Sequence, residues 1–185
     1  MRKLSMEELG RADIDAFKAQ PKTPLVLILD NVRSALNVGS AFRTADAFAL
    51  QKVFLCGITA RPPHREILKT ALGATESMEW EYAEDTAAAV RRLREDGYRV
   101  LAIEQVEGST SLAEFRWTDQ VPVALVFGNE VQGVDEATLA EVDGALEVPQ
   151  FGTKHSLNIS VCVGVVVWEL FRQWKYGKDF LNLET

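Results

Sequence analysis

Short apolar runs alternate along the chain with polar loops and amphipathic stretches. Two of these runs, residues 24–29 and 121–127, are typical of strands that are covered on both faces in a parallel sheet. We expect strands at 24–29, 52–56, 77–82, 99–103, 121–127 and 145–148. We expect helices between them at 40–49, 64–72, 85–96 and 136–141. This alternation predicts an α/β fold with a doubly wound, mostly parallel sheet.

A long helix is expected to end the fold. We place its start at Ser156, whose hydroxyl is suited to capping a helix N-terminus. Residues 161–168 are apolar on nearly every side, so this helix should be buried rather than lie on the surface.

The N-terminal residues predict a separate helix. Apolar residues in 4–19 have helical spacing, and Ser5 and Glu8 stand three apart, as in a capping box. Two prolines in 20–24 then end this helix. We therefore divide the chain into a helical extension at 1–23, a main domain at 24–174 and a C-terminal tail at 175–185. The extension is either a partner-binding element or a lid.

Composition narrows the class of protein. A length of 185 residues fits one domain with a substantial core. A net charge of −7 argues against nonspecific coating of nucleic acid, although a local basic face remains open. Cys56 and Cys162 lie in apolar stretches and are expected to be free thiols, and no metal-ligand spacing is present. Without a signal segment or a membrane-length apolar run, we expect a soluble cytoplasmic protein.

Several familiar nucleotide motifs are absent. Gly128 and Gly133 have the spacing of a P-loop, but Val134-Asp135 stands where Lys-Ser/Thr is required. No Gly-x-Gly-x-x-Gly follows a strand, which argues against a Rossmann dinucleotide site, and there is no Gly-x-Ser-x-Gly elbow.

Three polar loops remain, each after an apolar strand: residues 37–43, 128–133 and 152–158. In a parallel sheet such loops lie at one edge, where they can converge on a single cleft. They contain an arginine, a glutamate and several amides. This set suits a ligand with an anionic and a cationic part, or a hydroxyl substrate beside a phosphate.

The three loops resemble the signature motifs of the SPOUT superfamily, in its SpoU/TrmH branch of RNA ribose 2′-O-methyltransferases. The first motif resembles Asn37-Val-Gly39 with Arg43 and residues 45–48, and the second resembles residues 127–130 with Gly133. The third resembles Val148-Pro149, Gly152 and residues 156–160. The resemblance covers about residues 24–174. One departure is Gln150, where the family usually carries methionine.

The resemblance implies a deep trefoil knot near the C-terminus, with S-adenosylmethionine bound in the knot. By position, the cofactor would be lined by Ile103, Gly128, Val148, Gln150 and Leu157. It also implies a homodimer, which would cover apolar surface of the last helix around Trp168, Phe171 and Trp174. Arg43 would complete the site of the partner subunit, although its own subunit's site remains an alternative.

The resemblance implies a catalytic set of Arg43, Asn37, Glu130, Ser156 and Asn158. We expect Arg43 to hold the target phosphate and to lower the pKa of the hydroxyl. The alternative for Arg43 is a pair with Asp46 on an exposed helix turn.

The other members of this set have their own expected partners. Asn37 would orient Arg43 or the substrate, or serve only as a loop amide. Glu130 needs a partner, either Arg43 or the other subunit, because an unpaired buried carboxylate is costly. Ser156 and Asn158 would hold the substrate and the polar end of the cofactor.

RNA is the expected partner, and tRNA is favoured over rRNA because only a short helix precedes the main domain. Phosphate contacts are expected from Arg33, Arg61, His64, Arg65, Lys69 and Lys154. Residues 91–94 are interpreted as a solvated helix face. Two other functions stay open: a non-catalytic RNA-binding or assembly protein, which the intact catalytic set argues against, and a SPOUT enzyme that methylates a base nitrogen.

Overall fold

The computed structural model describes residues 1–5, 8–118 and 121–180. Its strands are β1 (Thr23–Asp30), β2 (Leu50–Cys56), β3 (Trp80–Ala83), β4 (Arg99–Ile103), β5 (Thr110–Ser111), β6 (Val123–Phe127) and β7 (Gly144–Glu147). Its helices are α1 (Ile14–Ala19), α2 (Ala35–Ala47), α3 (Arg65–Ala71), α4 (Ala74–Ser77), α5 (Thr86–Glu95), α6 (Glu136–Leu139) and α7 (Ile159–Phe180).

The seven strands form one sheet in the order β3-β2-β1-β6-β4-β7-β5, and every neighbouring pair is parallel. The prediction of an α/β fold with a mostly parallel sheet is therefore confirmed. The central strands β1 and β6 are buried almost throughout, as their continuous apolar sequences predicted. The trefoil knot stays a prediction.

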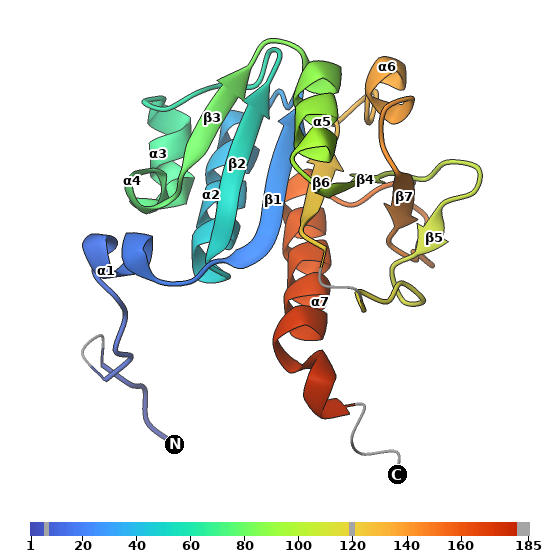
Figure 1. Cartoon of the computed structure of the whole chain (residues 1–185). Coiled ribbons are helices and arrows are strands. Elements are labelled where there is room, and N and C mark those ends of the chain that lie inside the picture. Colours follow the sequence, from blue (N-terminus) through green and yellow to red (C-terminus); the bar gives the residue numbers. More distant parts are fainter. Residues whose placement is uncertain (6–7, 119–120, 181–185) are drawn as a thin grey trace.

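Helices cover both faces of the sheet (Figure 1). Helices α2, α3, α4 and α7 enclose the larger core cluster, in which Phe42 of α2 and Leu170 of α7 are completely buried. Helix α5 covers the other face through Ala89, Val90 and Leu93. Because helices cover both faces of one parallel sheet, the sheet is doubly wound.

Helix α2 begins earlier than the sequence suggested. We expected residues 30–39 to be a loop, but the helix starts at Ala35 because Ser34 caps it and accepts a hydrogen bond from Asn37 N–H. Asn37 and Gly39 therefore lie in the first turns of a helix. Gly39 has to be glycine, since a β-carbon there would lie 2.1 Å from the Thr70 hydroxyl oxygen. This close contact brings α3 against α2.

Helix α7 begins later than expected. Its first residue is Ile159, and the residue that caps it is Asn158 rather than Ser156. The carbonyl of Asn158 accepts from Cys162 N–H, and its side-chain oxygen accepts from Ser160 N–H at 2.9 Å. Ser156 is left in the loop, free to face a ligand.

Helix α7 is also less buried than expected. Val163, Val166, Val167 and Leu170 are completely buried. In contrast, Val161, Val165 and Trp168 are 52%, 39% and 48% exposed, and their spacing places them on one stripe. A helix that is apolar on every side predicts burial on every side, and in this single chain that prediction was wrong for one face.

The N-terminal helix is shorter than predicted. The Ser5–Glu8 capping box forms, with Ser5 N–H donating to the Glu8 carboxylate, but it closes only a turn. Gly10 then adopts a left-handed φ of 56°, and α1 starts anew at Ile14 with Asp13 as its cap. The Ser5–Glu8 capping box was therefore predicted correctly, whereas the length of the helix predicted over 4–19 was wrong.

Two short elements had no sequence signal. Helix α4 occupies the start of the strand expected at 77–82, so β3 begins only at Trp80. Strand β5 has two residues and pairs with β7 at the sheet edge. No helix of the described part of the chain is long and apolar enough to cross a membrane.

Candidate active site

The carboxyl ends of four strands lie level at one edge of the sheet. Phe127 of β6 is in register with Leu29 of β1 and with Ile103 of β4, and Ile103 pairs in turn with Leu146 of β7. The residues that follow these positions form a row across the edge. The first and second motif loops leave this row from neighbouring strands, as the parallel sheet predicted.

Glu130 joins the second motif loop to the first. Its carboxylate accepts hydrogen bonds from the backbone N–H groups of Arg33 and Ser34 at 2.9 and 3.0 Å, and from the Asn37 side-chain amide at 3.0 Å. These donors surround the N-terminus of α2, where the helix dipole also favours negative charge. Glu130 therefore has hydrogen-bond partners, and within this chain Arg43 is not one of them; a contact with the other subunit stays a prediction. Glu130 is also exposed at a rim rather than buried.

The same hydrogen bonds set the ionisation of Glu130. Partial desolvation alone would raise the pKa of this carboxyl, but the donors from Arg33, Asn37 and Ser34 lower it below the ordinary value of 4.5. Glu130 is therefore held as a carboxylate at neutral pH.

Asn158 brings in the third motif loop. Its side-chain amide donates to the Asn37 side-chain oxygen at 3.4 Å, while its own oxygen caps α7. Asn37 thus contacts both other motifs, Glu130 through its nitrogen and Asn158 through its oxygen. Residues more than 90 positions apart in the sequence meet at this one amide.

A cavity of about 490 Å³ opens beside this junction. All five residues expected to contact the cofactor line it: Ile103, Gly128, Val148, Gln150 and Leu157. Glu130, Ser156 and Asn158 also line it. Asn37 and Arg43 are not among the lining residues.

Gly128 shapes the cavity by letting the second motif loop fold back on itself. A β-carbon at Gly128 would lie 2.1 Å from the carbonyl carbon of Gly133. Asn129 and Gly133 bond to each other through both backbone groups, closing a tight loop. Only glycine permits this approach of backbone to backbone.

Asn129 was missed in the sequence. Its side-chain oxygen accepts from Val131 and Gln132 N–H, and its amide nitrogen donates to the Asn31 carbonyl at 2.8 Å. Asn129 thus fixes the loop that carries Glu130 and ties it to the end of β1. The available signal was the turn-forming character of Asn beside Gly.

Arg43 lies apart from the cavity of its own chain. It is exposed and follows Asn37 by six positions along α2, which corresponds to a rise of about 9 Å and a different side of the helix. Among the described residues, the Arg43 side chain makes no ion pair or hydrogen bond. The pair with Asp46 does not form, because Asp46 accepts from the Ser77 hydroxyl at 2.6 Å.

Comparison with known proteins identifies the family. The sequence matches the SpoU rRNA methylase family over residues 24–168. The chain belongs to this family. It is 30% identical over 167 residues to the 23S rRNA (guanosine-2′-O-)-methyltransferase RlmB of Vibrio parahaemolyticus, with 90% of this chain and 66% of that protein covered. RlmB of Neisseria meningitidis is 31% identical over 159 residues, with 86% and 62% covered. The chain thus spans about two thirds of the length of these relatives.

Solved structures agree with the family assignment. An AdoMet-bound rRNA methyltransferase from Sinorhizobium meliloti superposes with a TM-score of 0.76 at 27% identity, covering 85% of this chain and 60% of that one. A protein described for 2-OH methylation of C/U34 on tRNA superposes with a TM-score of 0.72 at 29% identity. That match covers 83% of this chain and 99% of the other. The predicted SpoU/TrmH family is confirmed.

The two cysteines are not activated as nucleophiles, because burial disfavours their thiolate forms. Cys56 and Cys162 are free thiols, and burial raises their pKa to about 12 and about 11. No group of three His, Cys, Asp or Glu within the described ranges is placed to hold a metal ion.

The Glu130 junction predicts a pH-dependent stability difference. Replacement Glu130→Gln should lower the free energy of unfolding by about 1 kcal/mol at pH 7, because one amide oxygen cannot serve three donors. The folded pKa lies below 4.5, so the carboxylate stabilises the fold above that pH. Its contribution is lost as the pH falls through the folded pKa. Urea unfolding of both proteins between pH 7 and pH 3.5 measures the difference.

The control is Glu107→Gln, which removes the same charge from an exposed loop position. A Glu130→Gln difference that stays constant down to pH 3.5 would contradict the proposed role of the ionised carboxylate.

Proposed function

We propose that this chain transfers a methyl group from S-adenosylmethionine to a ribose 2′-hydroxyl of RNA. The observation that carries the proposal is the meeting of Asn37, Glu130 and Asn158, one from each motif, beside a single cavity. The names of the relatives RlmB and of the AdoMet-bound neighbour support the same reaction and cofactor.

The residues around the cavity fit the cofactor's mixed character. Apolar side chains of Ile103, Leu146, Val148 and Leu157 form walls suited to an adenine ring. Backbone groups of the tight 128–133 loop and the side chains of Gln150 and Ser156 supply polar partners. When bound, S-adenosylmethionine supplies a methyl group on a positively charged sulfur.

The protein's residues then position the attacking hydroxyl and help its proton leave. We assign Arg43 to holding a phosphate next to the target ribose, where its charge lowers the pKa of the hydroxyl. A guanidinium stays protonated, so Arg43 is not assigned as the base. Ser156 and Asn158 face the cavity and are assigned to holding substrate and cofactor.

Arg43 needs a second copy of the chain to reach a cavity. It lies off the cavity of its own chain, and the exposed stripe Val161, Val165 and Trp168 offers an apolar surface for a partner. This stripe borders a hollow of about 730 Å³ that also includes Leu112 and Pro149. We propose a homodimer through this face of α7, in which each Arg43 serves the partner's site.

Unpaired cations mark the proposed RNA surface. On α5, Arg91, Arg92 and Arg94 pair with Glu141, Glu81 and Asp143, respectively, at 2.7–2.9 Å. Within the described ranges, no ion pair forms at six other exposed cations: Arg33, Arg43, Arg61, Arg65, Lys69 and Lys154. These six lie in the loops that precede α2 and α3, on these two helices and in the third motif loop. Their charge is available to phosphates, whereas the charge of the α5 arginines is already compensated.

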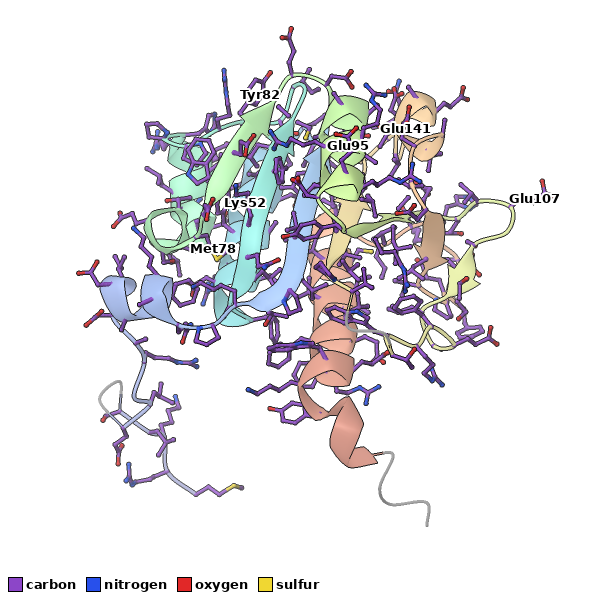
Figure 2. The ribbon with its side chains drawn as sticks, viewed as in Figure 1. Lys52, Met78, Tyr82, Glu95, Glu107 and Glu141 are labelled. Carbon is purple, nitrogen blue, oxygen red and sulfur yellow. The ribbon has the colours of Figure 1, made fainter. Side chains whose placement is uncertain are left out.

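Arg61 adds a second feature to this surface. Its guanidinium carbon lies 4.2 Å from the ring centroid of Tyr82, which Figure 2 places near the carboxyl end of β3. A stacked guanidinium keeps its N–H groups at the edge, where they can contact a phosphate. We favour tRNA as the substrate, because the neighbour described for tRNA matches this chain over 99% of its own length.

The first test is methyl transfer. Purified protein with radiolabelled S-adenosylmethionine is given tRNA and, separately, rRNA from cells that lack the protein. We expect label in tRNA that survives alkaline hydrolysis as a dinucleotide, since a 2′-O-methyl group blocks cleavage. Label on a base, or cofactor binding without any transfer, would contradict the proposal. The latter would favour a non-catalytic RNA-binding protein.

The shared site predicts complementation between two inactive variants. Arg43→Ala and Asn158→Ala should each lose most activity. A heterodimer should recover one working site, in which an intact cavity meets the partner's Arg43. The purified heterodimer should therefore have about half of wild-type activity, because one of its two sites works. Co-expression with two tags and assay of the doubly purified dimer measures this directly.

If Arg43 served its own cavity, both sites of the heterodimer would be defective and the mixture would stay inactive. A dimer of wild type with Arg43→Ala provides the reference for one lost site.

The RNA surface predicts an asymmetry between arginines. The double variant Arg61→Gln/Arg65→Gln should weaken tRNA binding and reduce the slope of log affinity against log salt by about 1 to 2. Arg91→Gln/Arg94→Gln is the matched control, because it removes the same charge from compensated positions. Filter binding from 50 to 300 mM salt reports both slopes. Equal losses in the two variants would argue for a general charge effect.

A further inference from the structure

Glu104 is a cavity residue that lies outside the three motif loops. It follows β4 directly and lines the same cavity as Gly128 and Leu157. Because Ile103 is in register with Phe127 and Leu146, Glu104 lies in the row formed by Gly128 on one side and Glu147 on the other. Its carboxylate therefore belongs to the edge of the sheet where the cofactor is proposed to bind.

The loop of the second motif holds this carboxylate in place. One oxygen accepts from Gln105 N–H at 2.9 Å, and the other accepts from Val134 N–H at 3.1 Å. The second oxygen also lies against Gly133, where a β-carbon would come within 2.2 Å of it. Both oxygens accept hydrogen bonds from backbone N–H groups. Glu104 is thus oriented by backbone groups.

No cation in the described lining compensates this charge. The lining includes the carboxylates of Glu104, Glu130 and Glu147, and no lysine or arginine. Glu130 is occupied by its three donors at the α2 N-terminus. The charge of Glu104 also reaches the wall that α7 forms, since burial raises the pKa of the Cys162 thiol and Glu104 raises it further.

We propose that Glu104 determines specificity for the charged form of the cofactor, favouring S-adenosylmethionine over S-adenosylhomocysteine. This inference rests on the proposed function. The methyl donor carries a sulfonium, an ammonium and a carboxylate group, for a net charge of +1. When the methyl–sulfur bond breaks, its electron pair stays on sulfur, and the product is a neutral thioether. A fixed negative charge in a semi-enclosed cavity attracts the donor more than the product.

This preference has a consequence for turnover. The transfer removes the positive charge that Glu104 attracts, so the product is held less tightly than the donor it replaces. Fresh donor can then displace the product. The same charge repels RNA, whose phosphates are attracted instead to the exposed cations on and before α2 and α3.

A hydrogen bond from Glu104 to a ribose hydroxyl would have a different signature. Donor and product share the same adenosine and the same amino-acid end, so that contact would affect both equally. Only an interaction with the sulfonium charge would change the affinity for the donor without changing the affinity for the product equally.

The test is isothermal titration calorimetry on the full chain with three ligands: S-adenosylmethionine, S-adenosylhomocysteine and sinefungin, which carries an ammonium in place of the sulfonium. Replacement Glu104→Gln should raise the Kd for the two charged ligands by about tenfold and the Kd for the neutral product by less than about twofold. The matched control is Glu107→Gln, whose side chain projects from the loop between β4 and β5 (Figure 2). It should leave all three Kd values unchanged.

A second variant separates charge from loop geometry. Glu104→Asp keeps the negative charge but shortens its reach to Val134 N–H. The ratio of the Kd for S-adenosylhomocysteine to the Kd for S-adenosylmethionine should therefore be preserved, even if both values rise. This ratio can also be read in wild-type protein, where raising salt should lower the preference for the donor.

Equal weakening of all three ligands in Glu104→Gln, or no change, would overturn the proposal. Wild-type protein that binds neither donor nor product would instead refute the proposed function itself.

Discussion

The site depends on one carboxylate at the N-terminus of one helix. Glu130 receives the Arg33 and Ser34 N–H groups that α2 cannot satisfy internally, and the Asn37 amide from its first turn. Without an anion there, the end of α2 would have to be satisfied by water, and the loops after β1 and β6 would lose their main connection. The Asn37 side-chain oxygen also accepts a hydrogen bond from the Asn158 amide, which links this junction to the start of α7. Three distant segments are thereby placed within the reach of one small ligand.

The charges of the molecule are separated in a way that suits two ligands of opposite sign. The cavity has carboxylates in its described lining, whereas exposed cations without ion pairs lie before and on α2 and α3 and in the third motif loop. A cationic methyl donor and a polyanionic RNA would then each meet an attractive surface. The arginines of α5, paired with Glu141, Glu81 and Asp143, contribute little to this field. A net charge of −7 is therefore compatible with RNA binding, since the unpaired charges and their positions matter more than the total.

Helix α7 combines several of these roles in one element. Asn158 caps it, Ile159 and Cys162 form part of the cavity wall, and Val166 and Val167 fill the core. Its remaining apolar stripe faces outward, which is why the proposed dimer and the proposed cofactor site share one helix. A change in this stripe would act on the cavity through the rigid helix.

Much of this protein could be predicted from its sequence. The continuous apolar runs at 24–29 and 121–127 required a sheet covered on both faces, because only burial on both sides satisfies them. The three polar loops after apolar strands predicted a shared site, and their motifs identified the family. Ser34 and Asn158 as caps were not identified, since several polar residues near each helix start can cap and only tertiary packing selects one. The Ser5–Glu8 capping box likewise formed without the long helix it suggested.

Only the tertiary structure decided which residues from distant parts of the chain contact one another. Glu130 has its partners about 95 positions away, and Glu104 contacts Val134 30 positions on, so no local pattern contains either contact. Arg43 was identified by its motif, but only the geometry of α2 showed that it lies off its own cavity. The sequence determined the fold class, the family and the chemical groups available, because these follow from local patterns. Which groups meet, and which remain unpaired, was decided by the packing of distant segments.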